Sequence, residues 1–486
     1  MSEPFIGHVI DGKEEESHGG GRFETVDPWA RTAWAQVAEG GADDVERAVS
    51  SARRAFTEGE WPRMGYEDRG RVLRGLAGLI EAHADELAAA DSRDMGRPVA
   101  QALAKDVTRA AANFRFFADH ARITGAEHYP SDLGCHVYTR YEAAGVVAAV
   151  SPWNFPLMLE SWKIAPALAH GNTVVLKPAE QSPASATLLA KLAIEAGLPA
   201  GVLNVVHGFG PRAAGEFLVS HPGVDRITFT GETATGKAIA RSAAGNLTPV
   251  SMELGGKGAN VVFADADLEL AVRWSVQAAF GNAGQVCLAG SRLFVERPVH
   301  EEFLARFTEA AEHLAVGDPR DRRTDIGPLA SAEHHAKVTS YLDAVERGGQ
   351  GKIVTGGRYA GDTWAVRPTV IVDAPEDAAV CREEIFGPVV VVTPFEREDE
   401  VVARANGTPY GLNAMLFTEN LRRAHRVAAA LKGGTVWVNC FFVRDLRAPF
   451  GGVGQSGIGR EGGAYSREFF TEPKAVVMNV GMPEGR

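Results

Sequence analysis

Between residues 145 and 231 the sequence reads, in order, GVVAAV (145–150), WKIAPALA (162–169), TVVLKP (173–178), ATLLAKLAIEAG (186–197), VLNVV (202–206) and RITFTG (226–231). Short apolar runs alternate here with longer amphipathic stretches. Strand, helix and strand in that order predict a doubly wound parallel sheet with right-handed connections. The stretch therefore predicts an α/β fold built on an open parallel sheet.

Similar patterns lie on both sides of this stretch. Towards the N-terminus, residues 45–120 are rich in alanine, and apolar residues recur every three or four positions, which predicts helices. Beyond Asn260 the alternation returns, and it predicts a second α/β lobe. The Gly-rich turn at 255–258 is a plausible hinge between the two lobes. The segments of the second series are NVVF (260–263), a helical pattern at 272–280, RLFVE (292–296), a helix from His300, VVVVTPF (389–395) and GTVWVN (434–439).

Two alternating segments, HVYTRY (136–141) and KAVVMNV (474–480), belong to neither series. Each has the pattern of an exposed strand, and an exposed strand needs a partner. We expect them to form a small bridging β-sheet used in self-association. The expected organisation is a dinucleotide-binding domain (1–121 and 144–254), a catalytic domain (255–470) and oligomerisation strands (122–143 and 471–486).

Composition narrows the class of protein. The 486 residues are 45% hydrophobic and 23% charged, which is typical of a packed globular chain. The net charge of −12 disfavours nucleic acid and anionic membrane partners. The N-terminal segment lacks the pattern of a signal peptide, so a cytoplasmic location is expected. The four cysteines have no metal-ligand spacing, and no metal is expected.

Three turns in the first series are candidates for phosphate or ribose binding. Gly208, Gly210 and Ala213 match the G-x-G-x-x-A dinucleotide pattern, although an ordinary turn fits them about as well. GETATGK (231–237) opens a helix, where backbone N–H groups suit a pyrophosphate. An NTPase is disfavoured, because Ala238 stands where such a loop needs a Ser or Thr hydroxyl to hold magnesium. LKPAE (176–180) follows a strand end, where Lys and Glu side chains can bind a ribose. Together the three turns favour a Rossmann-type site.

Three polar residues lie where chemistry is plausible. Cys287 is flanked by small residues that permit close approach of a substrate, although a buried thiol is the commoner role of a cysteine. A free thiol has a pKa of about 8.5, so a base or a positive field must raise its thiolate fraction. Glu253 is a candidate base at the end of a strand. Asn154, between two prolines in SPWNFP, is either held toward a site or an ordinary turn residue.

Seven motifs occur in a fixed order over nearly the whole chain: SPWNFP (151–156), LKPAE (176–180), FTGETATG (229–236), MELGGK (252–257), FGNAGQVC (280–287), EEIFGP (383–388) and PFGGVGQSGIGRE (449–461). In this combination the chain resembles the NAD(P)-dependent aldehyde dehydrogenase superfamily. The resemblance implies an aldehyde dehydrogenase-like fold and oxidation of an aldehyde to an acid. It also implies a homodimer or homotetramer.

The resemblance assigns roles to catalytic residues. Cys287 would attack the aldehyde to give a thiohemiacetal, whose oxyanion would be held by the Asn154 amide and the Cys287 backbone N–H. Hydride transfer would then leave a thioester. Glu253 would activate water for its hydrolysis, and Lys163 and Glu461 would relay the proton outward. Because a water-activating glutamate is present, a CoA-dependent reaction is disfavoured.

The cofactor implied is NAD. A carboxylate at position 180 should accept two ribose hydroxyls and repel a 2′-phosphate, which favours NAD over NADP. Glu232 stands where many relatives carry serine, so a side-chain contact with pyrophosphate is in doubt there. The expected cofactor-binding residues are Trp153, Lys177, Glu180, Gly210, Gly231, Gly236, Glu384 and Phe386.

The segments ANFRFFAD (112–119) and VRDLRAPFGG (443–452) resemble the branch that oxidises hydroxymuconic and aminomuconic semialdehydes, which carry a carboxylate. Arg109 and Arg444 are the expected carboxylate ligands, since an arginine fork binds a carboxylate bidentately. Two alternatives remain. The enzyme could act on other aliphatic or aromatic aldehydes with both arginines structural, for instance in an ion pair of Arg444 or Arg447 with Asp445. A catalytically inactive binding protein of the same fold is the alternative from another class.

Overall fold

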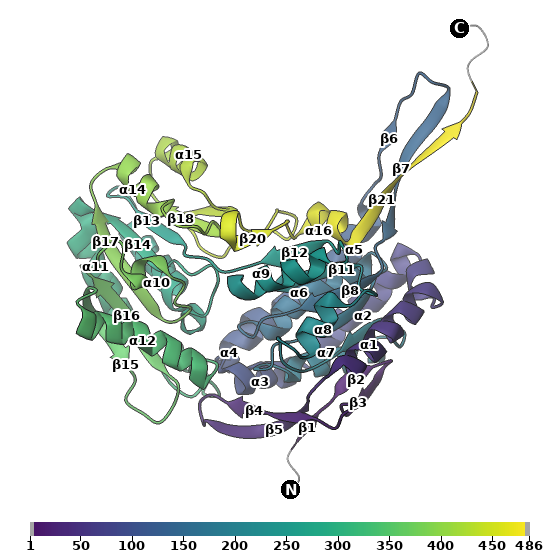
Figure 1. Ribbon diagram of the computed structural model, residues 1–486. Coiled ribbons are helices and arrows are strands. Elements are labelled where there is room, and N and C mark those ends of the chain that lie inside the picture. Colours follow the sequence, from purple (N-terminus) through teal and green to yellow (C-terminus); the bar gives the residue numbers. More distant parts are fainter. Residues whose placement is uncertain (1–3, 482–486) are drawn as a thin grey trace.

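The computed structural model describes residues 4–481, so the outermost residues of the expected ranges, 1–3 and 482–486, lie outside the described chain. Two large sheets, each accompanied by helices, lie side by side, and a small sheet projects from the body as an arm (Figure 1). The α/β fold with two lobes and a small extra sheet is confirmed.

The first large sheet has eight strands in the order β20-β12-β11-β8-β9-β10-β2-β3. Its five central strands are parallel: β8 (Val146–Val150), β9 (Thr173–Lys177), β10 (Leu203–Val205), β11 (Arg226–Thr230) and β12 (Val250–Glu253). Short antiparallel strands complete the edges: β2 (His8–Ile10), β3 (Lys13–Glu15) and β20 (Gly457–Ile458). The expected doubly wound sheet is therefore present.

Helices cover both faces of this sheet because its strands are apolar on both sides. In β8, Val147 and Ala149 enter one core cluster, whereas Val146 and Ala148 enter another. The connecting helices are α6 (Pro156–Ala169), α7 (Ala184–Glu195), α8 (Ala214–Ser220) and α9 (Thr233–Ala244).

The N-terminal segment contributes the predicted helices and a small sheet. The helices are α1 (Ala42–Thr57), α2 (Tyr66–Ala82), α3 (Ala84–Met95), α4 (Val99–Gln101) and α5 (Thr108–Ile123), with a π-helical turn at Ala102–Val107. Helix α5 packs on α6, with the rings of Phe117 and Trp162 5.4 Å apart. The small sheet consists of β1 (Phe5–Ile6), β4 (Arg22–Asp27) and β5 (Thr32–Ala38).

The second large sheet has seven strands in the order β15-β16-β17-β14-β13-β18-β19, and only β15 runs antiparallel to its neighbour. The strands are β13 (Ala259–Val262), β14 (Arg292–Glu296), β15 (Lys352–Arg358), β16 (Val366–Val372), β17 (Val389–Phe395), β18 (Asn413–Phe417) and β19 (Thr435–Val438). The helices are α10 (Leu268–Phe280), α11 (Arg297–Glu312), α12 (Ala332–Gly348), α13 (Ala379–Arg382), α14 (Glu398–Ala405) and α15 (Leu421–Ala430).

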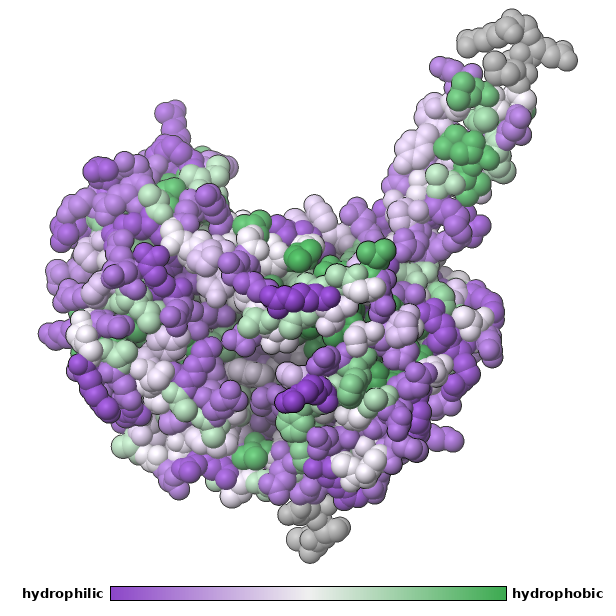
Figure 2. All heavy atoms as spheres, viewed as in Figure 1, coloured by the Kyte–Doolittle hydropathy of each residue, from purple (hydrophilic) through white to green (hydrophobic). Residues whose placement is uncertain are grey.

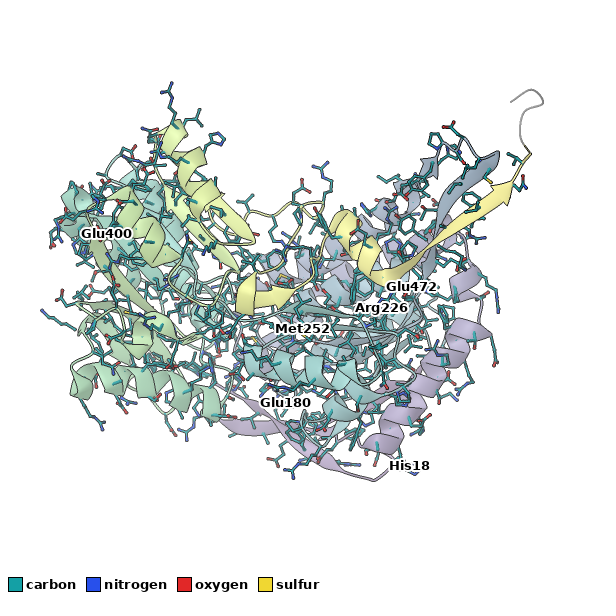
Figure 3. The ribbon with its side chains drawn as sticks, turned by 45° about the horizontal axis from the view of Figure 1, so that its top comes forward. His18, Glu180, Arg226, Met252, Glu400 and Glu472 are labelled. Atoms are coloured by element: carbon teal, nitrogen blue, oxygen red, sulfur yellow. The ribbon has the colours of Figure 1, made fainter. Side chains whose placement is uncertain are left out.

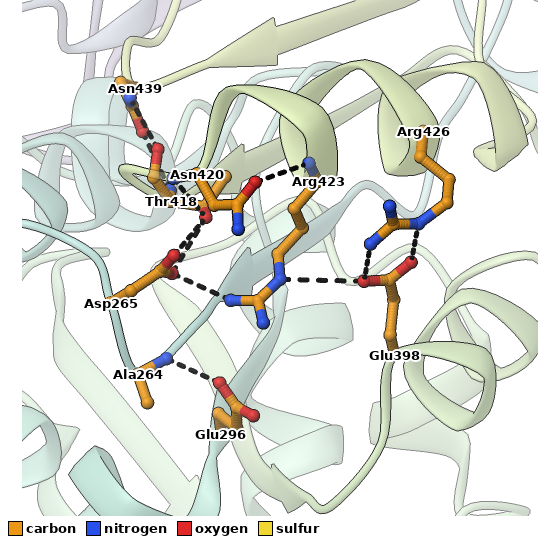
Figure 4. Close-up of polar contacts among 9 residues, drawn as sticks. All are labelled: Ala264, Asp265, Glu296, Glu398, Thr418, Asn420, Arg423, Arg426 and Asn439. Atoms are coloured by element: carbon orange, nitrogen blue, oxygen red, sulfur yellow. Dashed lines mark hydrogen bonds and ion pairs between the residues drawn. The ribbon is translucent and has the colours of Figure 1, made fainter.

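A polar network fixes the loop that follows β19. The Asn439 amide accepts from the Thr418 N–H and donates to the Thr418 carbonyl, both at 3.0 Å, and the Thr418 hydroxyl donates to Asp265 at 2.8 Å (Figure 4). Arg423 donates to the same carboxylate. The segment that continues from Asn439 to Arg444 is thereby anchored to the ends of two strands.

The projecting arm is the third part of the fold. Strand β7 (Cys135–Ala143) pairs antiparallel with β21 (Thr471–Asn479) over nine residues, and β6 (His128–Tyr129) extends the sheet. At its base, Arg226 of β11 forms an ion pair with Glu472 (Figure 3). Helix α16 (Gly463–Phe470) leads into the arm. The two segments that fitted neither α/β series therefore pair with each other.

Candidate active site

The carboxyl ends of the first sheet's parallel strands meet a cavity between the two lobes. The cavity has a volume of about 270 Å³. From the first lobe it is lined by Asn154, which follows β8, and Gly231, which follows β11; from the second it is lined by Cys287 and Glu384. Ligands of open α/β sheets bind at this edge. The structure thus brings together residues that are more than 200 positions apart in the sequence.

Cys287 is presented by a loop with unusual backbone geometry. After α10, three consecutive residues adopt positive φ: Asn282 (52°), Ala283 (54°) and Gly284 (70°). Only glycine fits at position 284, because a Cβ there would lie 2.0 Å from the Gly387 carbonyl oxygen. Burial raises the pKa of Cys287 to about 12, and Arg444 acts in the opposite direction. The thiol therefore needs a nearby base or positive charge to react.

The side chain of Asn154 is tied to the Cys287 loop. Its amide donates to the Gln285 carbonyl oxygen at 2.9 Å, and the Asn282 amide donates back to the Asn154 carbonyl oxygen at 2.8 Å. Asn154 is buried. The first bond holds the Asn154 side-chain amide against the loop that carries Cys287, and the second ties the Asn154 backbone carbonyl to the same loop.

Glu253 ends strand β12 and is buried. Neither of its carboxylate oxygens has a hydrogen-bond partner among residues 4–481. Burial, reinforced by the negative charge of Glu461, raises the pKa of Glu253 well above its usual range, while Lys163 and Arg444 lower it. A buried, unpartnered carboxylate with a raised pKa has the properties of a general base.

Glu461 and Lys163 are neighbours in a buried network. The Lys163 ammonium donates to Glu461 Oε1 at 3.2 Å and to the Thr228 hydroxyl at 3.0 Å. The indole N–H of Trp162 donates to Glu461 Oε2 at 2.6 Å. Sequence reasoning did not find Trp162, because nothing local indicates that it meets a residue 299 positions away.

A second groove, of about 620 Å³, continues from this cavity, with Trp153 and Gly231 lining both. Lys177, at the end of β9, donates to the Pro178 carbonyl oxygen at 2.7 Å and lies 3.8 Å from the Glu180 carboxylate. Glu180, which is labelled in Figure 3, is partly exposed. Gly210 lies in the same groove.

These residues fit a dinucleotide with a free ribose 2′-hydroxyl. Lys177 supplies donors and Glu180 supplies acceptors at one end of the groove. Helix α9 begins directly after Gly231 and Glu232, so its free N–H groups are available to a pyrophosphate. Gly236, inside that helix, must be small because a Cβ would lie 2.5 Å from the Leu254 side chain. The predicted cofactor residues Lys177, Glu180, Gly210 and Gly231 thus line one continuous groove.

At the cavity end, Glu384 accepts a hydrogen bond of 2.8 Å from the Gly256 N–H. Burial raises the pKa of Glu384 to about 7. Phe386 has a positive φ of 59° and meets the Trp153 ring edge-on at 5.3 Å. His334 contacts the Phe386 carbonyl oxygen at 2.7 Å. The sequence analysis did not assign α12 or His334 to the site, because an ordinary helical pattern does not indicate that a helix lines a cavity.

Arg444 is half-buried and lies over two aromatic rings. Its guanidinium carbon lies 3.8 Å from the ring centroid of Phe450 and 4.7 Å from that of Trp162. Its Nη2 has no hydrogen-bond partner within the described chain. Burial and the charge of Arg109 lower the pKa of Arg444 to about 10. The two arginines, which come from different elements, are therefore close enough to interact.

The alternative ion pair is made by the other arginine of this loop. Arg447 binds Asp445 with 2.6 Å between Nη2 and Oδ2, and both side chains are exposed. The structure thus separates an exposed ion pair, Arg447 with Asp445, from a half-buried guanidinium, Arg444.

Among the described residues, no group of three or more His, Cys, Asp or Glu side chains could hold a metal ion. Over the same residues, no helix is both long and apolar enough to span a membrane.

Comparison with known proteins identifies the family. The aldehyde dehydrogenase family model matches residues 15–476. The 2-hydroxymuconic semialdehyde dehydrogenase of Pseudomonas sp. (strain CF600) is 47% identical over 98% of this chain and 99% of that protein. A 2-aminomuconic 6-semialdehyde dehydrogenase of Pseudomonas sp. is 45% identical over 97% and 98%, respectively. The NAD⁺ complex of an aldehyde dehydrogenase from Bacillus cereus superposes with a TM-score of 0.96 at 41% identity, covering 99% of this chain and 97% of that one. The chain therefore belongs to the aldehyde dehydrogenase family and is an NAD-dependent enzyme that oxidises an aldehyde to a carboxylic acid.

Proposed function

We propose that the substrate is a semialdehyde that carries a carboxylate, of the 2-hydroxymuconic or 2-aminomuconic class. The observation that carries this proposal is Arg444: a half-buried guanidinium whose Nη2 is shielded from solvent and has no hydrogen-bond partner within the described chain, beside a second half-buried arginine, Arg109. The two positive charges act against each other, and a substrate acid group would offset that repulsion and accept a hydrogen bond from Nη2. The relatives named for muconic semialdehydes support the same class.

In the proposed mechanism the Cys287 sulfur attacks the aldehyde carbon, and the thiol proton passes to Glu253. The oxyanion of the thiohemiacetal is held by the Asn154 amide and the Cys287 backbone N–H. Bound NAD would supply the acceptor for the hydride that leaves this carbon, so that Cys287 is left as a thioester. Glu253 first passes the thiol proton outward through Lys163 and Glu461 and so becomes a carboxylate again. It then removes a proton from water, the resulting hydroxide attacks the thioester carbon, the Cys287 sulfur leaves as a thiolate, and the acid is released.

The cofactor would be held along the groove and the cavity. Lys177 and Glu180, which line the groove, would bind the adenine ribose, and the turn at Gly231 with the start of α9 would bind the pyrophosphate. Glu384, which lines the cavity with Trp153 and Phe386, would bind the nicotinamide ribose. The lobe built on the first sheet would thus bind NAD, and the lobe that carries Cys287 would perform the chemistry.

The arm is the proposed site of self-association into a homodimer or homotetramer. Its apolar side chains Tyr129, Leu133, Val477 and Met478 are exposed, and Figure 2 shows an apolar patch on the arm. Exposed apolar patches on a projecting sheet favour contact with another protein surface. We propose that the protein acts in the cytoplasm.

The substrate class is tested with R109A and R444A on two aldehydes of similar length, one with a terminal carboxylate and one neutral. Losing a buried hydrogen bond to a charged group costs about 1.5–3 kcal/mol, so kcat/KM for the acid should fall about 10- to 100-fold, mainly through KM. The neutral aldehyde should be affected far less. R447A, on the same loop but exposed, is the matched control and should leave both substrates unchanged. Equal losses on the two aldehydes would reject the proposal.

A further inference from the structure

Trp162 contacts two parts of the site that have separate tasks. Its indole N–H donates to Glu461 Oε2 at 2.6 Å, and its ring carries the Arg444 guanidinium at 4.7 Å. The side chain is buried, and the Phe117 ring packs against it. One rigid side chain therefore touches the proposed proton relay with its N–H and the proposed carboxylate-binding arginine with its ring.

The second ring beside Arg444 is tied to the same glutamate. Phe450, over which Arg444 lies at 3.8 Å, exchanges two backbone hydrogen bonds with Glu461, of 2.7 and 2.8 Å. Glu461 is thus fixed through its backbone by Phe450 and through its carboxylate by Trp162 and Lys163. Arg444 and Glu461 therefore both contact the same two residues, Trp162 and Phe450.

We propose that Trp162 is a positioning residue that couples substrate-carboxylate binding to the proton relay: its N–H orients Glu461, and its ring face orients Arg444. The role of the ring face toward Arg444 rests on the proposed substrate class. The role of the indole N–H toward Glu461 rests only on the hydrogen bond between them, and it holds for any aldehyde that this enzyme oxidises. Trp162 itself need not touch the reacting atoms.

Two substitutions separate the two tasks. W162F removes the indole N–H and keeps an aromatic face, whereas W162L removes both. W162F should lower kcat by about tenfold on acid and neutral aldehydes alike, the effect of losing one hydrogen bond to a charged group. If only hydrolysis slows, KM should fall together with kcat, so kcat/KM should change less than about twofold on both aldehydes. W162L should show the same loss in kcat and, in addition, a kcat/KM about fivefold lower for the acid substrate only, because the cation–π support of Arg444 is lost.

A pre-steady-state measurement distinguishes positioning from a general structural effect. If the relay serves thioester hydrolysis, W162F should show a larger burst of NADH before the steady state than the unmodified enzyme, because hydrolysis slows while hydride transfer does not. W61F is the matched control, since Trp61 is buried in the same core cluster and does not line the cavity. It should leave the burst and both KM values unchanged.

Unchanged kcat and burst in W162F would overturn the role of the indole N–H. A fall in kcat/KM of equal size on acid and neutral aldehydes in W162L would overturn the role of the ring. If R444A leaves the KM for the acid unchanged, the proposed substrate class is wrong and the ring has no carboxylate ligand to support. The kcat of W162F on a neutral aldehyde still decides the role of the N–H in that case.

Discussion

The side-chain amide of Asn154 donates a hydrogen bond of 2.9 Å to the carbonyl oxygen of Gln285, two residues before Cys287. This bond joins the turn after the first lobe's strand β8 to the loop of the second lobe that carries the thiol. It places an amide donor next to the sulfur before any substrate binds. A donor that is already oriented is most effective against a charge that develops only during the reaction.

Replacing this amide should slow the chemistry more than it weakens binding. N154A is expected to lower kcat on the order of 10²–10³-fold with little change in KM, because an oxyanion donor acts mainly in the transition state. Steady-state kinetics with a thermal-unfolding control measure this. N113A removes another buried asparagine, one that bonds Ser161 away from the cavity, and should not lower kcat in the same way. A kcat within a few-fold of the unmodified enzyme in N154A would contradict the assigned role.

The decrease of kcat toward acid pH should report the protonation of the Glu253 carboxylate. Its raised pKa means that kcat should fall with decreasing pH well above the usual range of a glutamate, because only the ionised carboxylate accepts a proton. The charge of Glu461 raises this pKa and that of Lys163 lowers it. E461Q should therefore move this decrease to lower pH, and K163M should move it to higher pH.

Steady-state kcat measured over a range of pH checks these shifts in both variants. Because each substitution also interrupts the relay, maximal kcat should fall in both, and the direction of the shift is the informative quantity. Shifts in the same direction would show that a group other than Glu253 controls the decrease.

Glu180 should decide between the two nicotinamide cofactors. Its carboxylate lies 3.8 Å from the Lys177 ammonium, where it would accept from ribose hydroxyls and repel a 2′-phosphate. E180A is expected to raise the KM for NAD and lower the KM for NADP. The ratio of the KM for NADP to the KM for NAD should therefore fall about tenfold or more. Cofactor titrations at saturating aldehyde measure both constants. E216A, an exposed glutamate in the same groove, serves as the control. An unchanged ratio of the two KM values in E180A would remove Glu180 from cofactor selection.

The sequence predicted those parts of the fold that local patterns determine. The alternation from 145 to 231 corresponds to four parallel strands and their helices, and β12 follows as the next. Strands β2 and β3 were not expected, because they are three residues each and join the sheet through pairing with β10, almost 200 positions away. Short edge strands owe their conformation to distant partners, which periodicity does not detect.

The site was predicted where motifs mark strand ends and missed where tertiary packing alone creates it. Cys287, Glu253 and Asn154 lie in Gly- or Pro-flanked turns that have a local signature. Trp162 and His334 lie on helices whose local pattern is ordinary, and their partners, Glu461 and Phe386, come from distant segments. The sequence also left Arg444 and Arg447 as equal candidates for the ion pair with Asp445. Burial separates them, and burial depends on the assembled fold.

The central claim is that Cys287 becomes acylated during turnover, and mass spectrometry of the unmodified enzyme, quenched with acid in its first turnover, tests it most directly. Before hydrolysis is complete, NAD and aldehyde should leave an acyl group on the peptide that contains Cys287, and the amount of this adduct should not exceed the NADH formed. C287S should show neither the adduct nor NADH. An acyl group on Cys135, Cys381 or Cys440, or undiminished NADH formation by C287S, would contradict the account.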